Sequence, residues 1–432
     1  MNTFFHSVTL DSSKCKGCIN CIKRCPTEAI RVRNGKAHII TERCIDCGEC
    51  IRVCPYKAKQ ASYDPISVIN GFKYKIALPA PSLYGQFNNL DDINIILKGL
   101  KLIGFDEVFE VSKAAEIVSD CTRKIMASGS IPRPIISSAC PAVTRLIRVR
   151  FPKLIEHVLP LNAPIEVACR MARADAALRT GLKPSEIGVI FITPCPAKVT
   201  AVKMPLGITK SDIDAVVAIK DVYPLLLSSM KNVSDDDDLQ DSGRIGVGWG
   251  SSGGEAGGTL NENYLAADGI ENVIRVLEDL EDEKFTELDF IELNACSGGC
   301  VGGVLTVENP YVARARLKRL RKYLPVSCNH IKNDIPQEAK WDTTLEFASV
   351  LKIADELTEA LHKMNEMEQI TKRLPGLDCG SCGAPSCHAL AEDIVRGIAS
   401  EEDCIFRLRD HMNNLVDELS KMEEYIPPPF RR

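Results

Sequence analysis

The stretch ELNACSGGCVGG, residues 292–303, separates Cys296 from Cys300 by three residues and surrounds both cysteines with small side chains. An apolar run, residues 290–293, overlaps its start. This pattern is typical of a buried strand that opens into a loop of small residues. The stretch therefore predicts a site at the end of a strand, where two thiol groups lie close together.

Three other apolar runs end in loops of the same kind. The runs RPIISSACP and IGVIFITPCPAK lead to Cys140 and Cys195, and YKIALPAPS ends in Ala80, Pro81 and Ser82. Open α/β sheets build their sites where parallel strands end. We therefore expect four loops to converge on one cavity, and three of them to bring cysteines into it.

The composition of the chain is that of an ordinary globular protein. Its 432 residues are 45% hydrophobic and 26% charged, and the net charge of −5 does not indicate nucleic-acid or lipid binding. No apolar run reaches the ~18–20 residues of a membrane span. The start, MNTFFHSVTLDSSKC, lacks the basic and apolar regions of a secretory signal. We therefore expect a cytoplasmic protein with no nucleic-acid or membrane partner.

The 19 cysteines are strongly clustered, with eight in residues 15–54 and four in residues 379–404. Disulfide-rich proteins are usually small and secreted, and this chain is expected to be neither. In a reducing compartment, clustered cysteines are typical metal ligands.

Residues 15–26 and 44–55 repeat the pattern C-x2-C-x2-C-x3-C-P of bacterial ferredoxins. In this pattern, three thiolates of one repeat hold a [4Fe–4S] cube, and the fourth reaches the cube of the other repeat. Zinc, the alternative metal, does not require such interleaving. The ligands predicted for the first cluster are Cys15, Cys18, Cys21 and Cys54. The ligands predicted for the second are Cys44, Cys47, Cys50 and Cys25.

A third set of cysteines has the spacing C-x2-C-x4-C-x16-C. It resembles the small [4Fe–4S] domain found beside corrinoid iron–sulfur proteins and electron-transfer subunits. Zinc is again the alternative metal. The predicted ligands are Cys379, Cys382, Cys387 and Cys404.

The chain is predicted to be an α/β multidomain protein. The expected parts are a ferredoxin-like α+β domain at 1–63, an α/β domain with parallel sheets at 66–345, a connecting helix at 346–371, a small, mainly helical domain at 372–410 and an amphipathic tail at 411–432. On the tail, Met412, Leu415, Leu419 and Met422 share one side. This side is expected either to pack on its own domain or to form a homodimer contact.

Three of the loops resemble, in order, the signature motifs of the [FeFe]-hydrogenase active-site domain. The family's first motif, TSCCP, corresponds to SSACP at 137–141, and its second, PC-x2-K, to PCPAK at 194–198. Its third, C-x3-C followed by glycines, corresponds to 296–303. The resemblance covers residues 66–310, and the N-terminal ferredoxin repeat also occurs in many family members.

The resemblance implies an H-cluster, a [4Fe–4S] cube linked to a two-iron unit with CO, CN⁻ and a bridging dithiolate, beside three accessory [4Fe–4S] clusters. The sulfur of Cys300 would also bridge to the two-iron unit, and the glycines around it would let the backbone lie close to the cofactor. The implied cube ligands are Cys140, Cys195, Cys296 and Cys300.

Lys198 is the expected donor to a cyanide nitrogen of the two-iron unit, which is a charge-assisted contact. A surface ion pair is the alternative role for this lysine. The loop Ala80, Pro81 and Ser82 is expected to line the dithiolate side.

Several residues depart from the family pattern. Ala139 stands where the family has a proton-relay cysteine, and Thr193 and Asn294 stand where methionines often pack on the two-iron unit. The usual relay glutamates are not evident in IVSDCTRKIM, residues 117–126. These changes resemble the sensory branch of the family, so we expect slow hydrogen turnover.

A replacement proton path is expected to use Glu255, in the glycine-rich stretch GWGSSGGEAGG at residues 248–258. Cys169 is the second candidate, although a buried cysteine is usually inert. Cys121 and Cys328 are interpreted as structural.

The resemblance implies reversible conversion of H₂ into protons and electrons, with ferredoxin or another redox protein as electron partner and a signalling partner for a sensor. One alternative is an iron–sulfur assembly or scaffold protein without the two-iron unit. Another is a plain electron-transfer protein, which would not require Lys198 or the glycine loops.

Overall fold

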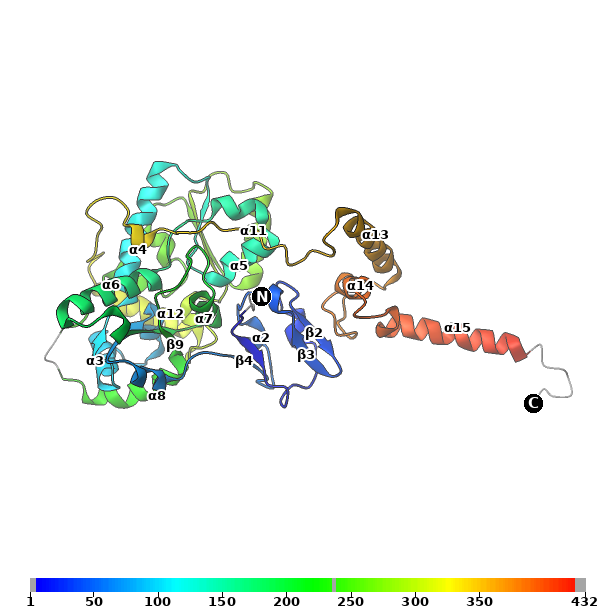
Figure 1. The fold of residues 1–432 in the computed structure, drawn as a ribbon, viewed down its shortest axis with the longest axis horizontal. Coiled ribbons are helices and arrows are strands. Elements are labelled where there is room, and N and C mark those ends of the chain that lie inside the picture. Colours follow the sequence, from blue (N-terminus) through cyan, green and yellow to red (C-terminus); the bar gives the residue numbers. More distant parts are fainter. Residues whose placement is uncertain (1–4, 235–237, 424–432) are drawn as a thin grey trace. The chain divides into compact units, whose positions relative to one another are not determined.

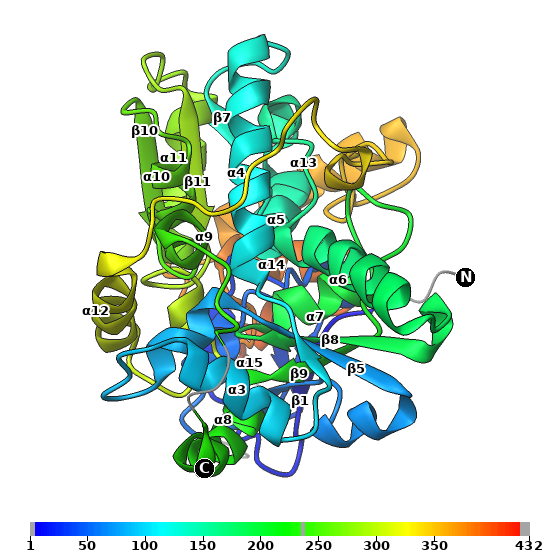
Figure 2. The ribbon, with the colours of Figure 1, turned by 90° about the vertical axis from the view of Figure 1, so that its left-hand side faces the viewer.

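The computed structural model of the protein describes residues 5–234 and 238–423, which form two units. The first unit consists of the chain up to Thr9, Ile45–Gly48 and Ala61–Ala348. The second consists of Leu10–Cys44, Glu49–Gln60 and the chain from Ser349 onward. Most of the ferredoxin-like segment therefore shares a unit with the C-terminal region. Figures 1 and 2 show the helices and strands.

Two parallel sheets organise the first unit. Their strands are β5 (Tyr74–Pro79), β6 (Glu107–Val108), β7 (Ile135–Ile136), β8 (Ile187–Thr193), β9 (Ala215–Ala218), β10 (Tyr264–Asp268) and β11 (Phe290–Asn294). One sheet has the order β6-β5-β8-β9 and the other β10-β11-β7, with every neighbouring pair parallel. All seven residues of β8 are buried, as expected for a parallel strand covered on both faces.

Helices cover both faces of the four-stranded sheet (Figure 2). The helices of this unit are α3 (Asn94–Leu102), α4 (Val111–Ser128), α5 (Pro141–Arg150), α6 (Pro164–Thr180), α7 (Pro196–Lys203), α8 (Ile219–Ser229), α9 (Arg244–Gly248), α10 (Gly254–Gly258), α11 (Ile270–Glu281) and α12 (Pro310–Leu320). Residues of α4 and α6 join one apolar core with the sheet, and residues of α3 and α8 join another.

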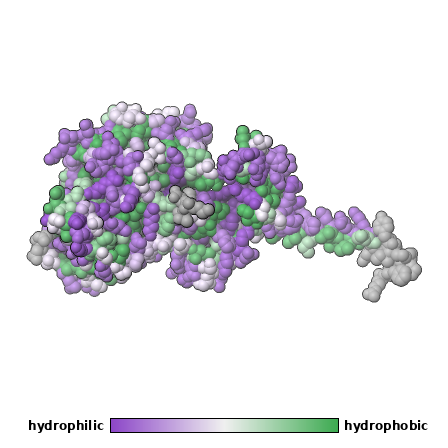
Figure 3. All heavy atoms as spheres, in the orientation of Figure 1, coloured by the Kyte–Doolittle hydropathy of each residue, from purple (hydrophilic) through white to green (hydrophobic). Residues whose placement is uncertain are grey.

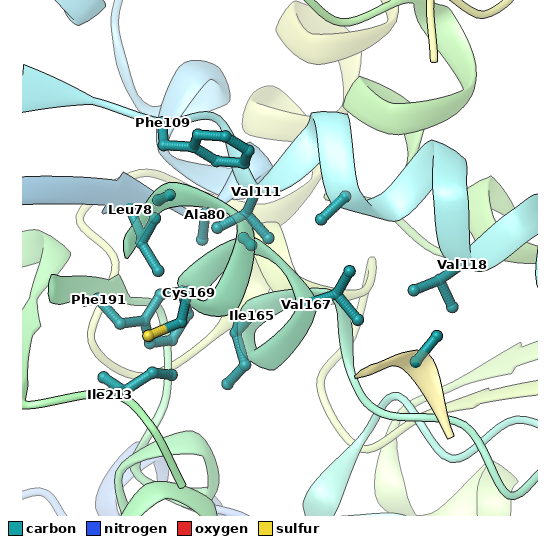
Figure 4. Close-up of a cluster of buried hydrophobic side chains, with 14 of the residues drawn as sticks. Leu78, Ala80, Phe109, Val111, Val118, Ile165, Val167, Cys169, Phe191 and Ile213 are labelled. Atoms are coloured by element: carbon teal, nitrogen blue, oxygen red, sulfur yellow. The ribbon is translucent and has the colours of Figure 1, made fainter. Parts of the chain in front are cut away.

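Figure 4 shows the first of these cores. Leu78 of β5 and Phe191 of β8 are fully buried there, together with Val111 of α4 and Ile165 of α6. Each such side chain stabilises the fold by about 1.5–3 kcal/mol relative to an exposed one. This layered arrangement confirms the predicted α/β class with parallel sheets.

The second unit combines a small α+β fold with a helical C-terminal part. In the α+β fold, β2 (Ile30–Arg33) and β3 (Lys36–Ile39) pair antiparallel. The remaining elements of the N- and C-terminal regions are β1 (Val8–Leu10), β4 (Lys59–Ala61), α1 (Asn20–Lys23), α2 (Glu49–Arg52), α13 (Leu357–Arg373), α14 (Cys387–Val395) and α15 (Ile405–Glu423). Residues of α13 and α14 share one apolar core.

Buried ion pairs join the ferredoxin-like fold to α14. Arg43 pairs with Glu392, and Arg31 donates from Nε to Asp393 Oδ2 at 2.8 Å. Arg33 reaches the same Asp393 oxygen at 2.7 Å. Buried charges of this kind are stable only when each has its partner, so these pairs fix the two parts of this unit against each other.

The predicted connecting helix over 346–371 begins later than expected. The structure starts α13 at Leu357. Before it, Arg148 donates from Nε to the Glu346 carbonyl at 2.6 Å, and the Ala348 N–H donates to the Arg148 carbonyl at 3.0 Å. Backbone groups bonded in this way do not form a helical ladder, so apolar spacing alone predicted too long a helix.

The apolar side of α15 is exposed, and Figure 3 shows it as a stripe along the helix. The exposed fractions are 57% for Met412, 46% for Leu415, 63% for Leu419 and 66% for Met422. The expectation that this side packs on its own domain is therefore wrong, and the homodimer contact stays a prediction. No helix in the described part of the chain has the length and apolar character to span a membrane.

We expect Gly383→Ala to loosen the C-terminal part from the ferredoxin-like fold. Gly383 has φ +83°, and a Cβ there would lie 1.9 Å from the Val32 carbonyl oxygen. Its own carbonyl accepts from the Val32 N–H at 2.8 Å. The substitution should cost about 3 kcal/mol or more. It should lower the thermal unfolding midpoint and speed tryptic cleavage within residues 349–423.

Gly397→Ala is the matched control. Gly397 also has a left-handed φ, +72°, but a Cβ there would meet no atom within 4 Å. Only the backbone cost of about 1 kcal/mol should remain. Equal effects of the two substitutions would contradict the close approach at Gly383.

Candidate active site

The three predicted cysteine loops begin where strands of the first unit end. Cys140 and Cys195 each precede a proline at the start of a helix, α5 and α7 respectively. Cys296 follows β11, and Cys300 begins a short 3-10 helix in the same loop. The Gly299 N–H donates to the Cys296 carbonyl at 3.0 Å, so this loop is a tight turn.

Lys198 of α7 lies among these loops. Its side chain is buried, and its Nζ donates to the Ala139 carbonyl at 3.1 Å. Burial acts to lower its pKa, but the charges that Cys300, Cys195 and Cys140 carry in their thiolate forms outweigh burial, and the net shift of the pKa is upward. The alternative role of a surface ion pair is wrong, because the ammonium group is buried and bonded to a backbone carbonyl.

The thiols beside Lys198 are perturbed as well. Burial raises the pKa of Cys195 to about 11 and that of Cys300 to about 12, and the charge of Lys198 acts in the opposite direction on both. A buried thiol with so high a pKa keeps its proton at neutral pH unless a metal ion replaces it. The donor set therefore suits a positively charged metal core.

A small cavity borders both Lys198 and Cys300. The loop Ala80, Pro81 and Ser82 lines the same cavity. The Ser82 hydroxyl is buried and has no hydrogen-bond partner among the described residues. An unpaired buried donor is costly unless a ligand accepts its hydrogen bond. The hydroxyl and the ammonium therefore fit a group that carries acceptor atoms, as a two-iron unit with CN⁻ and CO does.

Two glycines let the loops approach one another. A Cβ at Gly303 would lie 2.2 Å from the Pro194 carbonyl oxygen, and one at Gly299, which has φ +87°, would lie 2.3 Å from the Ser252 nitrogen. No side chain fits at either position. Close approach to the cofactor was the expected reason for these glycines, but among the described residues they are already required by contacts between loops.

Glu255 of α10 borders the same cavity. It accepts a hydrogen bond from Ser137 Oγ at 2.7 Å, and that hydroxyl accepts from the Ala139 N–H at 3.1 Å. Burial and then the charge of Glu292 raise its pKa to about 8, while Ser137 and Lys198 act to lower it. A carboxyl group with this pKa exchanges protons near neutral pH.

Glu292 of β11 is a functional candidate that was not predicted from the sequence. Its carboxylate accepts from the Gly253 N–H at 3.0 Å, from the Ala256 N–H at 2.8 Å and from Asn294 Nδ2 at 2.7 Å. Burial raises its pKa, whereas these donors act to lower it. It also borders the cavity. Its signal in the sequence is a lone charged residue within the apolar run 290–293.

Cys169, the second proton-path candidate, does not border this cavity. It lies in the core of Figure 4 with Phe191 and Ile213, and its thiol donates to the Asp212 carbonyl at 3.1 Å. Burial raises its pKa far above the ordinary value. The structure therefore does not bring Cys169 to the site. Of the two remaining cysteines, Cys121 is buried and Cys328 is exposed.

The fourth cysteine of each N-terminal motif accepts an equivalent hydrogen bond at its sulfur. Cys25 Sγ accepts from the Ala29 N–H at 3.2 Å, and Cys54 Sγ accepts from the Ala58 N–H at 3.3 Å. The two motifs therefore share one local geometry around the fourth cysteine.

Cysteines of the two N-terminal motifs also affect one another's pKa values. Burial raises the pKa of Cys50, and the charges of Cys44 and Cys25 add to the rise. Burial raises the pKa of Cys21 to about 11, and the charge of Cys18 adds to it. Cys25 of the first motif thus lies near cysteines of the second. The role of these cysteines as cluster ligands stays a prediction.

The C-terminal cysteines gather at a small apolar core. Cys404 is buried in it, and Cys382 and Cys387 pack against it. Burial raises the pKa of Cys382, and the charges of Cys379 and Cys404 add to the rise. The proximity of these thiols fits one cluster, and their role as ligands also stays a prediction.

Three known families match parts of this chain. The family described as "Iron only hydrogenase large subunit, C-terminal domain" matches residues 73–262 and 254–304, together more than half of the chain. A 4Fe-4S dicluster domain matches residues 7–55, and an Fe-S cluster family matches residues 374–406. Iron–sulfur clusters are therefore part of this protein.

Two curated relatives are hydrogenases. The periplasmic [Fe] hydrogenase large subunit of Nitratidesulfovibrio vulgaris is 29% identical over 212 residues, which are 45% of this chain and 50% of that protein. Iron hydrogenase 1 of Clostridium pasteurianum is 22% identical over 372 residues, 69% of this chain and 64% of that protein. The chain thus spans less than two thirds of the length of either relative.

Solved structures share the fold. An [FeFe]-hydrogenase studied for oxygen inactivation and degradation of its H cluster 2Fe subcluster gives a TM-score of 0.52 at 15% identity, over 64% of this chain and 95% of that one. An [FeFe]-hydrogenase of Chlamydomonas reinhardtii gives 0.51 at 14% identity, over the same shares of both chains. At these identities the likeness concerns the fold alone.

We expect Glu255→Gln to stabilise the protein at about pH 9 and to have little effect at about pH 5. The pKa of about 8 in the folded state lies above the ordinary value of 4.5. Folding therefore takes up a proton between these values, and stability falls as the pH rises through this window. The amide cannot ionise, so the variant avoids a loss on the order of 5 kcal/mol. Thermal unfolding midpoints measure the difference.

Glu262→Gln, at an exposed glutamate, is the control and should show no such difference between the two pH values. An equal effect of Glu255→Gln at both pH values would show that burial does not suppress the charge of Glu255.

Proposed function

This chain belongs to the family of the iron-only hydrogenase large subunit, C-terminal domain, and on that premise we propose that it is a sensory [FeFe]-hydrogenase. In this proposal it interconverts H₂ with two protons and two electrons. The observation that carries the proposal is the buried ammonium of Lys198, which lies among cysteine thiols and lines a cavity with the unpartnered Ser82 hydroxyl.

The chain holds the H-cluster through its three cysteine loops. When bound, the H-cluster supplies the two-iron unit at which H₂ is split or formed. Lys198 would donate to a cyanide of that unit, and Ser82 would offer a second donor. Cys300 would hold the two-iron unit as well as the cube. The cube ligands are Cys140, Cys195, Cys296 and Cys300.

Two buried carboxyl groups form the proton path. Ala139 has no side-chain proton to exchange, so it cannot act as the relay that the family has at this position. Glu255 takes up or releases a proton at Oε2, which already accepts a hydrogen bond from Ser137. Because burial and then the charge of Glu292 raise the pKa of Glu255, this pair holds a proton readily near neutral pH.

The sensory assignment rests on the substituted positions. Ala139, Thr193 and Asn294 replace the relay cysteine and two methionines of the family pattern. Asn294 borders the cavity and donates to Glu292, so it contributes to the carboxyl pair. A site with these replacements should turn over hydrogen slowly and serve detection.

Three accessory clusters connect the site to a redox partner. Cys47 packs against the apolar core that also supports Cys140 and Cys195. In the second unit, Arg33 donates from Nη1 to the Cys382 carbonyl at 2.6 Å and so joins the C-terminal cysteine loop to the ferredoxin-like fold. Ferredoxin or another redox protein, and the signalling partner of a sensor, are expected to exchange electrons with this unit.

Infrared spectroscopy of the fully matured protein tests the cofactor. CO and CN⁻ bands should appear, with about eighteen irons per chain, the content of four cubes and one two-iron unit. Cys300→Ser should lose these bands, because it removes the bridge to the two-iron unit and one ligand of its cube. It should retain the iron of the N-terminal clusters, whose proposed ligand sets do not include Cys300.

Cys328→Ser, at an exposed cysteine outside the proposed ligand sets, should keep all bands and all iron. Bands that survive in Cys300→Ser would refute the bridging role. Their absence from the matured wild type would favour the assembly or scaffold protein.

Hydrogen oxidation across pH tests the proton path. Glu255→Gln should lower the rate at least about tenfold at every pH, because the amide cannot relay a proton. Ser137→Ala should move the pH profile upward, because the hydroxyl acts to lower the pKa of Glu255. Infrared bands and iron content should stay unchanged in both variants.

Cys169→Ala is the control for this path and should oxidise hydrogen as the wild type does. A Glu255→Gln protein with the wild-type rate and profile would remove Glu255 from the path.

A further inference from the structure

Lys59, the first residue of β4, is a buried lysine of the second unit. Its side chain is 2% exposed, and its Nζ has no hydrogen-bond partner among the described residues. Burial of an unpaired ammonium group is strongly unfavourable. A lysine at this position is therefore stable only if a negatively charged group lies beside it.

The internal repeat shows what the fold itself requires at this position. The sequence CPYKAK, residues 54–59, repeats CPTEAI, residues 25–30, so Lys59 is equivalent to Ile30. Ile30 is 3% exposed. In both repeats the N–H of the preceding alanine donates to the fourth cysteine. An apolar side chain is thus sufficient for packing at this position. Packing therefore does not explain why Lys59 carries a charge there.

The neighbours of Lys59 are cysteines of both motifs. The charge of Lys59 interacts with the thiols of Cys21 and Cys50, which belong to different motifs. It also interacts with Cys54, whose Sγ accepts from the N–H of the neighbouring Ala58 at 3.3 Å. In the proposed ligand sets, Cys21 and Cys54 belong to one cluster and Cys50 to the other. The ammonium group therefore lies near ligands of both sets.

We propose that Lys59 is the shared counter-charge of the two N-terminal [4Fe–4S] clusters and raises their reduction potentials. The inference rests on the cluster ligands of the proposed function. A cube held by four thiolates is anionic and becomes one charge more negative when it accepts one electron. A buried cation therefore stabilises the reduced cube more than the oxidised one, and the low dielectric strengthens the effect. Electrons released by H₂ oxidation then remain on these clusters more readily.

Redox titration of the full-length, cluster-loaded protein, followed by electron paramagnetic resonance, tests this role. In Lys59→Met and in Lys59→Ile, which restores the residue of the other repeat, at least one N-terminal cluster should become harder to reduce. At a fixed potential its ratio of reduced to oxidised form should fall about tenfold, which corresponds to about 59 mV for a one-electron couple. Iron content should match the wild type.

Lys16→Met is the matched control, because Lys16 lies between two ligands of the same motif but is exposed. Solvent screens its charge, so its loss should change the potentials much less. Unchanged potentials in both Lys59 variants, or an equal change in Lys16→Met, would overturn the proposal.

Two further outcomes separate the proposal from its premise. A wild type without two N-terminal cluster signals would overturn the ligand sets and, with them, the shared role of Lys59, whereas unchanged potentials in a protein with both signals would overturn the role of Lys59 alone. If both Lys59 variants lose this iron, Lys59→Arg decides. Retained clusters with wild-type potentials in Lys59→Arg support the charge, whereas their loss there shows a requirement for shape and overturns the proposal.

Discussion

The charge of Lys198, buried among thiols from different loops, is the interaction on which the site of the first unit depends. A buried ammonium is stable only beside negative charge. The thiols of Cys195 and Cys300, with their raised pKa values, lose their protons only beside a cation. Lysine and thiolates therefore require each other, and an anionic thiolate-bound metal cluster satisfies both. Parallel strands supply the scaffold, because their ends open into loops at one edge.

The proposed proton exchange follows from the same burial. Ala139 has no side-chain proton to exchange, yet its backbone N–H donates to Ser137, whose hydroxyl donates to Glu255. Two carboxyl groups in one buried region cannot both ionise easily, so burial and then the charge of Glu292 keep the pKa of Glu255 high. In our proposal, electrostatic coupling between carboxyl groups thus replaces a thiol as the source of a mobile proton.

In the described part of the chain, the second unit contains two kinds of buried positive charge, one paired with carboxylates and one without such a partner. Arg31 and Arg43 have carboxylate partners on α14, and these pairs hold the C-terminal part against the ferredoxin-like fold. Lys59 has no such partner among the described residues and lies near cysteines of both N-terminal motifs. Paired charges of the first kind support structure. A charge such as that of Lys59 acts instead on the clusters that the thiolates are proposed to bind. For this reason we propose that Lys59 raises their reduction potentials.

Residue types and spacing within single segments determined much of this protein. The α/β class was predicted from the apolar runs before Cys195 and Cys296. The loops that border one cavity were predicted from the cysteine motifs and from the small residues that follow these runs. Both predictions were possible because strand periodicity and ligand spacing are local properties. Only the tertiary structure decided which distant groups meet. The non-helical backbone at Glu346 and Ala348 depends on bonds to Arg148. The place of Glu292 beside Glu255 depends on how α10 packs on β11. Such contacts arise from segments far apart along the chain, and local pattern carries no information about them.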